Sequence, residues 1–211
     1  MMKSSISRNS ILLGLFAVLT TTIIAGTYLG TRERIAEEQR KAAEKALLEI
    51  VPLDRHNNAM LDDTVGVGAE TSLLGLRKDA DIYIARRDGV PVAVILPAIA
   101  RDGYSGDIQL IIGINIDGTV AGVRTLAHRE TPGLGDKVDL KKSPWILDFN
   151  GRSLREPLPE KWAVKKDRGV FDQFTGATIT PRAVTAAVKR ALEYYAEHRH
   201  ELLGIEEDDN G

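Results

Sequence analysis

The pattern of hydrophobic and polar positions changes sharply near the start of this 211-residue chain. Ile11 to Gly30 form an unbroken stretch without a charged residue. As an α-helix with a rise of about 1.5 Å per residue, this stretch is long enough to cross a hydrocarbon core of roughly 30 Å. We therefore predict a transmembrane helix over residues 11–30.

Charged residues follow the apolar stretch, but the helical spacing of apolar positions continues. Residues 31–52 are rich in Ala, Glu, Lys and Arg, and Pro52 ends the pattern. This predicts that the membrane helix continues outward as an amphipathic stalk with a solvated charged face.

Charges at the two ends of the apolar stretch predict its orientation. Lys3 and Arg8 precede it, whereas residues 32–34 follow with mixed sign. By the positive-inside rule, we expect residues 1–10 to form a cytoplasmic tail and the main domain to lie on the other side of the membrane. A cleaved signal peptide is disfavoured because the stretch is long and no small-x-small cleavage site follows, and the absence of cysteine excludes lipoprotein processing.

Further along the chain the period shortens to that of β-strands. Ile82–Ala85 and Val90–Leu96 flank an Arg-Asp-Gly turn, and Ile108–Ile116 and Val120–Leu126 flank Asp-Gly-Thr. These segments predict two antiparallel hairpins. The continuous apolar run in the third segment indicates a central strand with buried faces.

The last third of the chain predicts helices packed on this sheet. Ser143–Phe149 is expected as a short helix, Trp162–Lys166 as a strand and Pro181–Leu203 as a long amphipathic helix. Residues 53–205 thus form one α+β domain with a small antiparallel sheet packed by helices. Residues 206–211 are expected to be a disordered acidic tail.

Composition removes several classes of function. A net charge of −2 without a clustered basic surface excludes nucleic-acid binding. The chain has no cysteine, which excludes thiolate metal sites and iron–sulfur clusters. The four histidines lack ligand spacing, so we expect no metal site. The predicted span contains no ionisable residue and cannot form an ion path alone.

Candidate chemistry lies at the start of the long helix. Thr180 is expected to be the N-cap, with Pro181 at the first helical position, so Thr178 stands just before the helix. Such an end favours phosphate, Gly176 permits close approach of a ligand, and Arg182 adds positive charge. On physical grounds alone, a helix cap with its entry loop explains these residues better.

A resemblance changes that balance. The run Asp172 to Thr178 is similar to the flavinylation motif of proteins modified by an FMN transferase: Asp, two variable residues, Ser or Thr, Gly, Ala and a final Ser or Thr. The resemblance implies that FMN is joined covalently through its phosphate to the Thr178 hydroxyl, which makes the chain a flavoprotein and a phosphoprotein. Its implied neighbours are Thr175, Gly176, Ala177 and Thr180. Since no base is evident beside Thr178, a separate transferase must load it.

A second run, His128 to Asp136, resembles the loop that accompanies the flavin in FMN-binding domains. Its glycines and proline are also those of a tight connection after a strand. The resemblance implies that the flavin pocket includes His128, Glu130, Thr131, Leu134 and Gly135. None of these residues is assigned a catalytic role.

Together with residues 102–107 and the single span, these runs resemble the G subunits of the Rnf (also called Rsx) electron transport complexes. This implies a membrane-anchored electron-transfer subunit that is not an enzyme on its own. The resemblance places it in a bacterial inner membrane, with the main domain in the periplasm. There it would work with other membrane subunits to couple electron flow between ferredoxin and NAD to ion translocation. The alternatives are a C subunit of the sodium-translocating NADH:quinone oxidoreductase and, from another class, an anchored non-redox binding or scaffold module.

Overall fold

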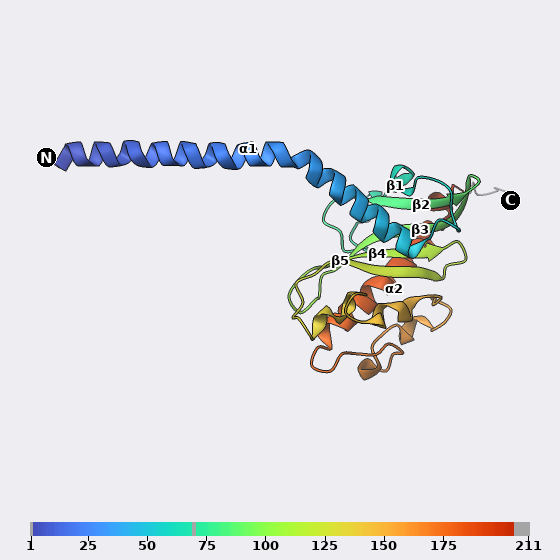
Figure 1. Ribbon diagram of the computed structural model, residues 1–211. Coiled ribbons are helices and arrows are strands. Elements are labelled where there is room, and N and C mark those ends of the chain that lie inside the picture. Colours follow the sequence, from blue (N-terminus) through green and yellow to red (C-terminus); the bar gives the residue numbers. More distant parts are fainter. Residues whose placement is uncertain (1, 69–70, 205–211) are drawn as a thin grey trace. The chain divides into compact units, whose positions relative to one another are not determined.

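The computed structural model describes residues 2–68 and 71–204 and divides into two compact units, Met1–Ala43 and Glu44–Gly211. The helix α1 (Met2–Ile50) begins in the first unit and ends in the second (Figure 1). Its continuity confirms that the apolar stretch and the predicted stalk form one helix. The predicted acidic tail, residues 206–211, lies outside the described residues.

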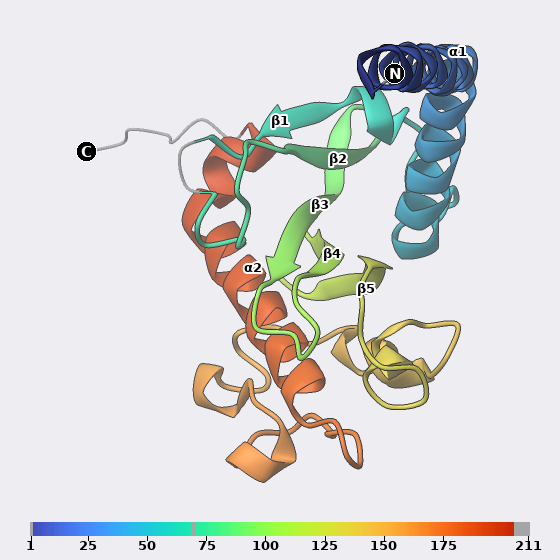
Figure 2. The same ribbon diagram turned by 90° about the vertical axis from the view of Figure 1, so that its left-hand side faces the viewer.

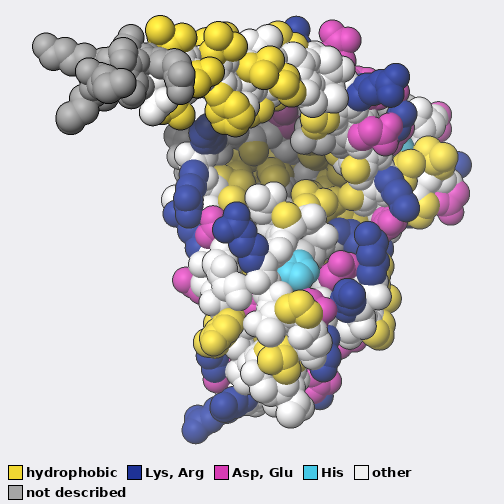
Figure 3. Space-filling model, turned by 60° about the vertical axis from the view of Figure 1, so that its left-hand side comes forward, with side chains coloured by type: hydrophobic (Ala, Val, Ile, Leu, Met, Phe, Trp, Pro, Cys, Tyr) yellow, Lys and Arg dark blue, Asp and Glu magenta, His cyan; other side chains and the backbone are white. Residues whose placement is uncertain are grey.

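In the first unit the large apolar side chains of α1 are exposed, as the crowded hydrophobic surface of this helix in Figure 3 shows. Thr22, Thr27 and Thr31 each donate a hydroxyl hydrogen bond of 2.8 Å to the carbonyl oxygen four residues earlier. Their polar hydrogens are therefore satisfied within the helix, as a hydrocarbon environment requires. Among the described residues, α1 is the one helix long and apolar enough to span a membrane.

The second unit is built on an antiparallel sheet of five strands in the order β1-β2-β3-β4-β5. The strands are β1 (Thr64–Gly66), β2 (Asp81–Arg87), β3 (Val90–Ala100), β4 (Ile108–Asn115) and β5 (Val120–Ala127). Both predicted hairpins are confirmed. They are joined through the pairing of β3 with β4, and the short edge strand β1 was not predicted.

One face of the sheet is covered by α2 (Ile179–Leu203), which runs along it in Figure 2. Val184, Val188, Ala191 and Leu192 are buried in the main core together with the apolar side chains of this sheet face. The predicted amphipathic helix and its inward face are thereby confirmed. The helix begins two residues earlier than predicted, at Ile179 rather than Pro181.

The other face of the sheet receives the last turns of α1. Leu47 and Ile50 are buried in a second, smaller core, and the backbones of the paired residues Gly113 and Gly122 leave a hollow for Ile50. A Cβ atom at Gly113 would lie 2.2 Å from the Ile50 Cγ2 atom. The compact unit therefore begins at Glu44, before the boundary at residue 53 that we expected.

Between the sheet and α2 the chain forms short 3-10 helices rather than strands. Together with one before β1, they are η1 (Met60–Asp62), η3 (Gly135–Val138), η4 (Pro144–Phe149), η5 (Pro159–Lys161) and η6 (Lys165–Asp167). The predicted short helix is confirmed as η4, with Ser143 as its cap.

The predicted strand at Trp162–Lys166 is wrong. Within it only Val164 forms a bridge, to Phe171, and the chain then turns through η6 to Arg168, whose φ is +66°. Trp162 is buried against Phe171, with 5.1 Å between the ring centroids. The apolar residues that produced a strand-like pattern are thus anchors of an aromatic cluster.

Candidate functional site

A cavity of about 340 Å³ opens where the start of α2 meets the loops that follow β3 and β5. Its lining residues are Tyr104, Glu130, Thr131, Leu134, Gly135, Gly176, Ala177, Thr178, Ile179 and Thr180. The structure therefore brings the motif at the start of α2 together with the loop after β5, although the two are far apart in the sequence. Of the predicted site residues, Thr175 and His128 do not line this cavity.

Thr178 occupies the N-cap position of α2, with φ −72° and ψ −28°. Its side chain is partly exposed in the cavity and makes no capping hydrogen bond. Its carbonyl oxygen accepts a hydrogen bond of 3.3 Å from the Arg182 backbone N–H and so begins the helical ladder. The residue that starts the helix therefore leaves its hydroxyl free for other chemistry.

The expectation that Thr180 caps the helix is wrong. Thr180 is the second helical residue, its side chain is fully buried, and its hydroxyl donates a hydrogen bond to the Glu130 carboxylate. Pro181 consequently stands at the third helical position. Because no residue of the first turn needs its N–H for an intrahelical bond, a proline there does not fix where the helix begins.

Glu130 is 5% exposed and joins three segments of the chain. One carboxylate oxygen accepts the Ser105 N–H at 2.9 Å, and the other accepts the Thr180 hydroxyl. Gly135 makes room for this contact, since a Cβ atom there would lie 2.7 Å from Glu130 Oε2 and 2.8 Å from Thr180 Oγ1. We refer to Glu130, Thr180, Ser105 and Gly135 as the Glu130 clamp. Outside the cavity, His128 Nδ1 accepts the Glu130 N–H at 3.1 Å, which shapes the loop.

The motif that ends at Thr178 is a tight turn. Ala177 N–H donates to the Phe174 carbonyl oxygen at 3.1 Å, and Gly176 takes a φ of +80°, which favours glycine. Phe174 is buried edge-on against Trp145, with ring centroids 5.0 Å apart, and the Trp145 indole N–H donates to the Asp172 carbonyl oxygen at 2.8 Å. Aromatic packing and this hydrogen bond therefore hold the turn in place.

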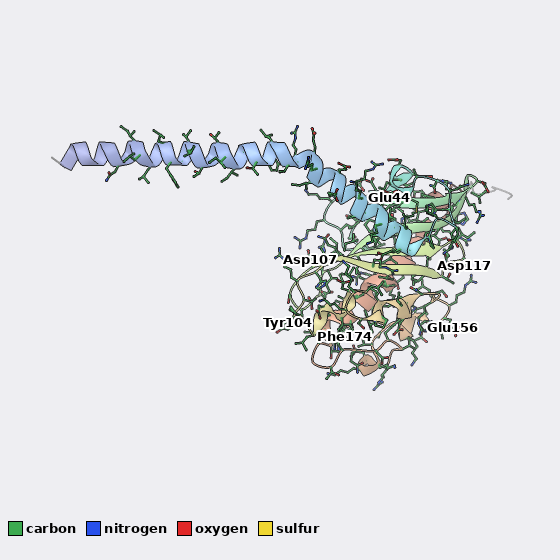
Figure 4. The ribbon with its side chains drawn as sticks, viewed as in Figure 1. Glu44, Tyr104, Asp107, Asp117, Glu156 and Phe174 are labelled. Carbon is green, nitrogen blue, oxygen red and sulfur yellow. The ribbon has the colours of Figure 1, made fainter. Side chains whose placement is uncertain are left out.

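The mouth of the cavity has an apolar rim. Tyr104, Leu134 and Ile179 are 69%, 41% and 44% exposed, although all three side chains line the cavity. In Figure 4, Tyr104 and Phe174 lie on the opposite side of this unit from Asp117. Sequence reasoning missed Tyr104 and Ile179, because exposure of an apolar side chain at a cavity leaves no periodic signal.

Contrary to our expectation, Arg182 does not add positive charge to the cavity. The Arg182 guanidinium does not line the cavity but forms two hydrogen bonds with Asp167, of 2.6 Å and 2.9 Å. Hydrogen bonding by Arg182 holds the pKa of the Asp167 carboxyl below its usual range and raises the pKa of the guanidinium. Arg182 thus ties the start of α2 to the turn at η6.

Two families match the sequence. The FMN-binding domain matches residues 103–193, which include every residue that lines the cavity, and the RnfG N-terminal region matches residues 1–50. The chain is 50% identical over 205 residues to the G subunit of the ion-translocating oxidoreductase complex of Pseudomonas aeruginosa, covering 97% of this chain and 95% of that protein. It is 48% identical to the corresponding G subunit of Shewanella loihica, over 96% and 95% of the two chains.

Among solved structures, the C subunit of the Na⁺-translocating NADH-quinone reductase from Parabacteroides distasonis overlaps with 56% of this chain and 62% of its own. The TM-score is 0.43 and the sequence identity 23%. A likeness of this size does not bear on function.

Proposed function

Because the chain belongs to the family of G subunits of ion-translocating oxidoreductase complexes, we propose that it carries FMN on the Thr178 hydroxyl, through a phosphoester, and relays electrons within such a complex. The family relationship favours this function over the C subunit that we considered as an alternative. The proposal of covalent attachment rests on the motif at residues 172–178 together with the geometry at Thr178.

The observation that carries the proposal is the contrast between two neighbouring hydroxyls. Thr178 presents a hydroxyl without a capping bond to the cavity, whereas the Thr180 hydroxyl is buried and bound to Glu130. A phosphate on Thr178 would lie at the N-terminus of a 25-residue helix. The free N–H groups and the helix dipole favour an anion there by about 0.3–1 kcal/mol.

The remaining residues fit a flavin. The volume of about 340 Å³ lies in the range of small-molecule sites. The space beside Gly176 is open, since a Cβ atom there would meet nothing closer than the Leu134 side chain at 3.6 Å. Tyr104, Leu134 and Ile179 would give the planar ring apolar contacts, and the loop of Thr131 would border the rest of the cofactor. When bound, FMN supplies the one- or two-electron redox chemistry.

Attachment requires a second protein. A threonine hydroxyl is a poor nucleophile without a base, and Glu130 is the one carboxylate that lines the cavity. Both of its oxygens already accept hydrogen bonds, from Ser105 and Thr180. We therefore assign the base to an FMN transferase, as the motif at residues 172–178 implies.

The proposed orientation follows from charge and helix length. Residues 1–10 would be cytoplasmic, residues 11–30 would span the inner membrane, and the α+β domain would lie in the periplasm beside the membrane subunits of the complex. A covalently held flavin suits that compartment, because it cannot be lost by dissociation.

The test is flavin fluorescence after denaturing electrophoresis of protein co-expressed with an FMN transferase. We expect a fluorescent band for the wild type and for Thr178→Ser, which keeps the hydroxyl, and no band for Thr178→Ala. A fluorescent Thr178→Ala band would refute attachment at this residue. A dark wild-type band in the presence of active transferase would instead favour the non-redox scaffold.

A further inference from the structure

A basic turn lies beside the motif and belongs to neither the cavity nor the core. It consists of Lys165, Lys166 and Arg168, around the 3-10 helix η6, and all three side chains are exposed. We call it the basic turn. Because none of the three side chains is buried, their positive charges face the solvent.

The backbone of the basic turn is fixed to the segment that precedes Thr178. Lys165 N–H donates to the Phe171 carbonyl oxygen at 2.7 Å, next to the bridge between Val164 and Phe171. Lys166 N–H donates to the Gln173 side-chain oxygen at 3.2 Å. Phe171 itself is buried, so the turn is attached to an anchored residue of the core.

The same turn is also fixed to the segment that follows Thr178. Asp167, between Lys166 and Arg168, holds the Arg182 guanidinium with distances of 2.6 Å and 2.9 Å. Arg182 lies in the first turn of α2, where its N–H bonds to the Thr178 carbonyl oxygen. The basic turn is therefore held to the chain on both sides of the acceptor threonine.

The ion pairs of this surface leave an excess of positive charge. Arg182 neutralises Asp167, and Lys165 neutralises Asp172, with 2.6 Å between Nζ and Oδ1. In the part of the chain that the structure describes, Lys166 and Arg168 have no such partner. Two exposed cations thus stand on a turn that is bonded to the segments before and after Thr178.

We propose that the basic turn is the docking surface for the FMN transferase, which would present an acidic rim around its active site. This inference rests on the proposed function, because the enzyme that loads Thr178 must approach this surface, and the two exposed cations favour an acidic surface on that enzyme. Two cations on an anchored turn would attract an acidic protein and favour one orientation of its approach over others. The cavity itself offers no cation to do this, since its lining holds none.

The step that docking serves is a phosphoryl transfer. The Thr178 oxygen attacks the phosphorus of a flavin phosphoanhydride bound by the transferase. The new P–O bond to threonine forms as the P–O bond to the leaving nucleotide breaks, and the hydroxyl proton passes to a base of the transferase. No group changes oxidation state.

The experiment measures the initial rate of covalent flavin incorporation into the full-length protein in detergent, with purified transferase and its flavin donor. Lys166→Glu/Arg168→Glu should slow loading on the order of tenfold at low salt, and the deficit should shrink as salt rises. The matched control is Lys45→Glu/Arg155→Glu, which changes the charge equally at two exposed residues outside the motif. It should load at the wild-type rate.

The outcomes separate the two proposals. If the wild type is loaded and Thr178→Ala is not, while the basic-turn variant loads as fast as the wild type, docking at the basic turn is overturned and attachment stands. Equal slowing of both double variants also overturns it, because the effect is then one of net charge. Normal loading with slow electron exchange would assign the turn to a redox partner instead. If the wild type is never loaded, attachment itself fails.

Discussion

The turn that leads into α2 and the first turn of α2 itself place two threonines in opposite environments. Thr178, in the first region, lines the cavity with a hydroxyl that makes no capping bond. Thr180, in the second, is fully buried and donates to Glu130. Two residues of the same type, two positions apart, thus differ: the first is the attachment point that we propose, and the second supports the fold. Burial and hydrogen-bond partners decide the division, since the side chains are identical.

The largest loss of stability is expected where the supporting region is most tightly packed. Gly135→Ala would place a methyl group within 3 Å of both Glu130 and Thr180 and push apart the two side chains of the Glu130 clamp. Overpacking and the broken buried hydrogen bond together should cost about 3 kcal/mol in the free energy of unfolding. Denaturant unfolding of the α+β unit within the full chain measures this. Gly133→Ala, in the same loop, cannot serve as the control, because alanine at a φ of +78° would strain the backbone.

A smaller effect separates the two threonines directly. Thr180→Val keeps the shape but leaves a buried Glu130 oxygen without its donor, which should lower the free energy of unfolding by about 2 kcal/mol. Thr178→Val removes a hydroxyl with no capping bond and should change it by less than about 0.5 kcal/mol. Equal losses in the two variants would contradict the division of roles.

The smallest effect concerns the exposed ion pair between Asp167 and Arg182. The hydrogen bond from Arg182 lowers the pKa of Asp167 in the folded state, so its stabilising effect is present above the usual aspartate pKa and is lost as the pH falls through the lowered value. Below about pH 4, we expect the free energy of unfolding of Asp167→Asn to fall slightly less steeply with decreasing pH than that of the wild type. A profile as steep as that of the wild type would show that this pair adds nothing to stability. Because the pair is exposed, the change should be smaller than that of Thr180→Val.

The periodicity of apolar residues predicted the main strands and the long C-terminal helix well. The two hairpins and the inward face of α2 each rest on several residues with a repeated spacing, and tertiary packing agreed with them. The short strand β1 has three residues and gives no such signal. Trp162–Lys166 resembled a strand in sequence because two buried apolar residues, Trp162 and Val164, are spaced two apart as in a strand.

The site could be predicted only in part. The resemblance identified site residues in two of the three segments that form the cavity, and most of the residues it implied do line it. The roles of Thr180 and Arg182 were misjudged, because each depends on a partner distant in the sequence, Glu130 and Asp167. Tyr104 was missed for a related reason: its contribution arises from where the loop after β3 folds.

The most direct test of the central claim is mass spectrometry of the protein isolated after co-expression with the transferase. The tryptic peptide of residues 169–182 contains Thr175, Thr178 and Thr180. We predict a mass increase equal to FMN minus one water on this peptide, and fragment ions that place it on Thr178. An unmodified peptide under these conditions, or fragment ions that place the group on Thr175 or Thr180, would contradict the account.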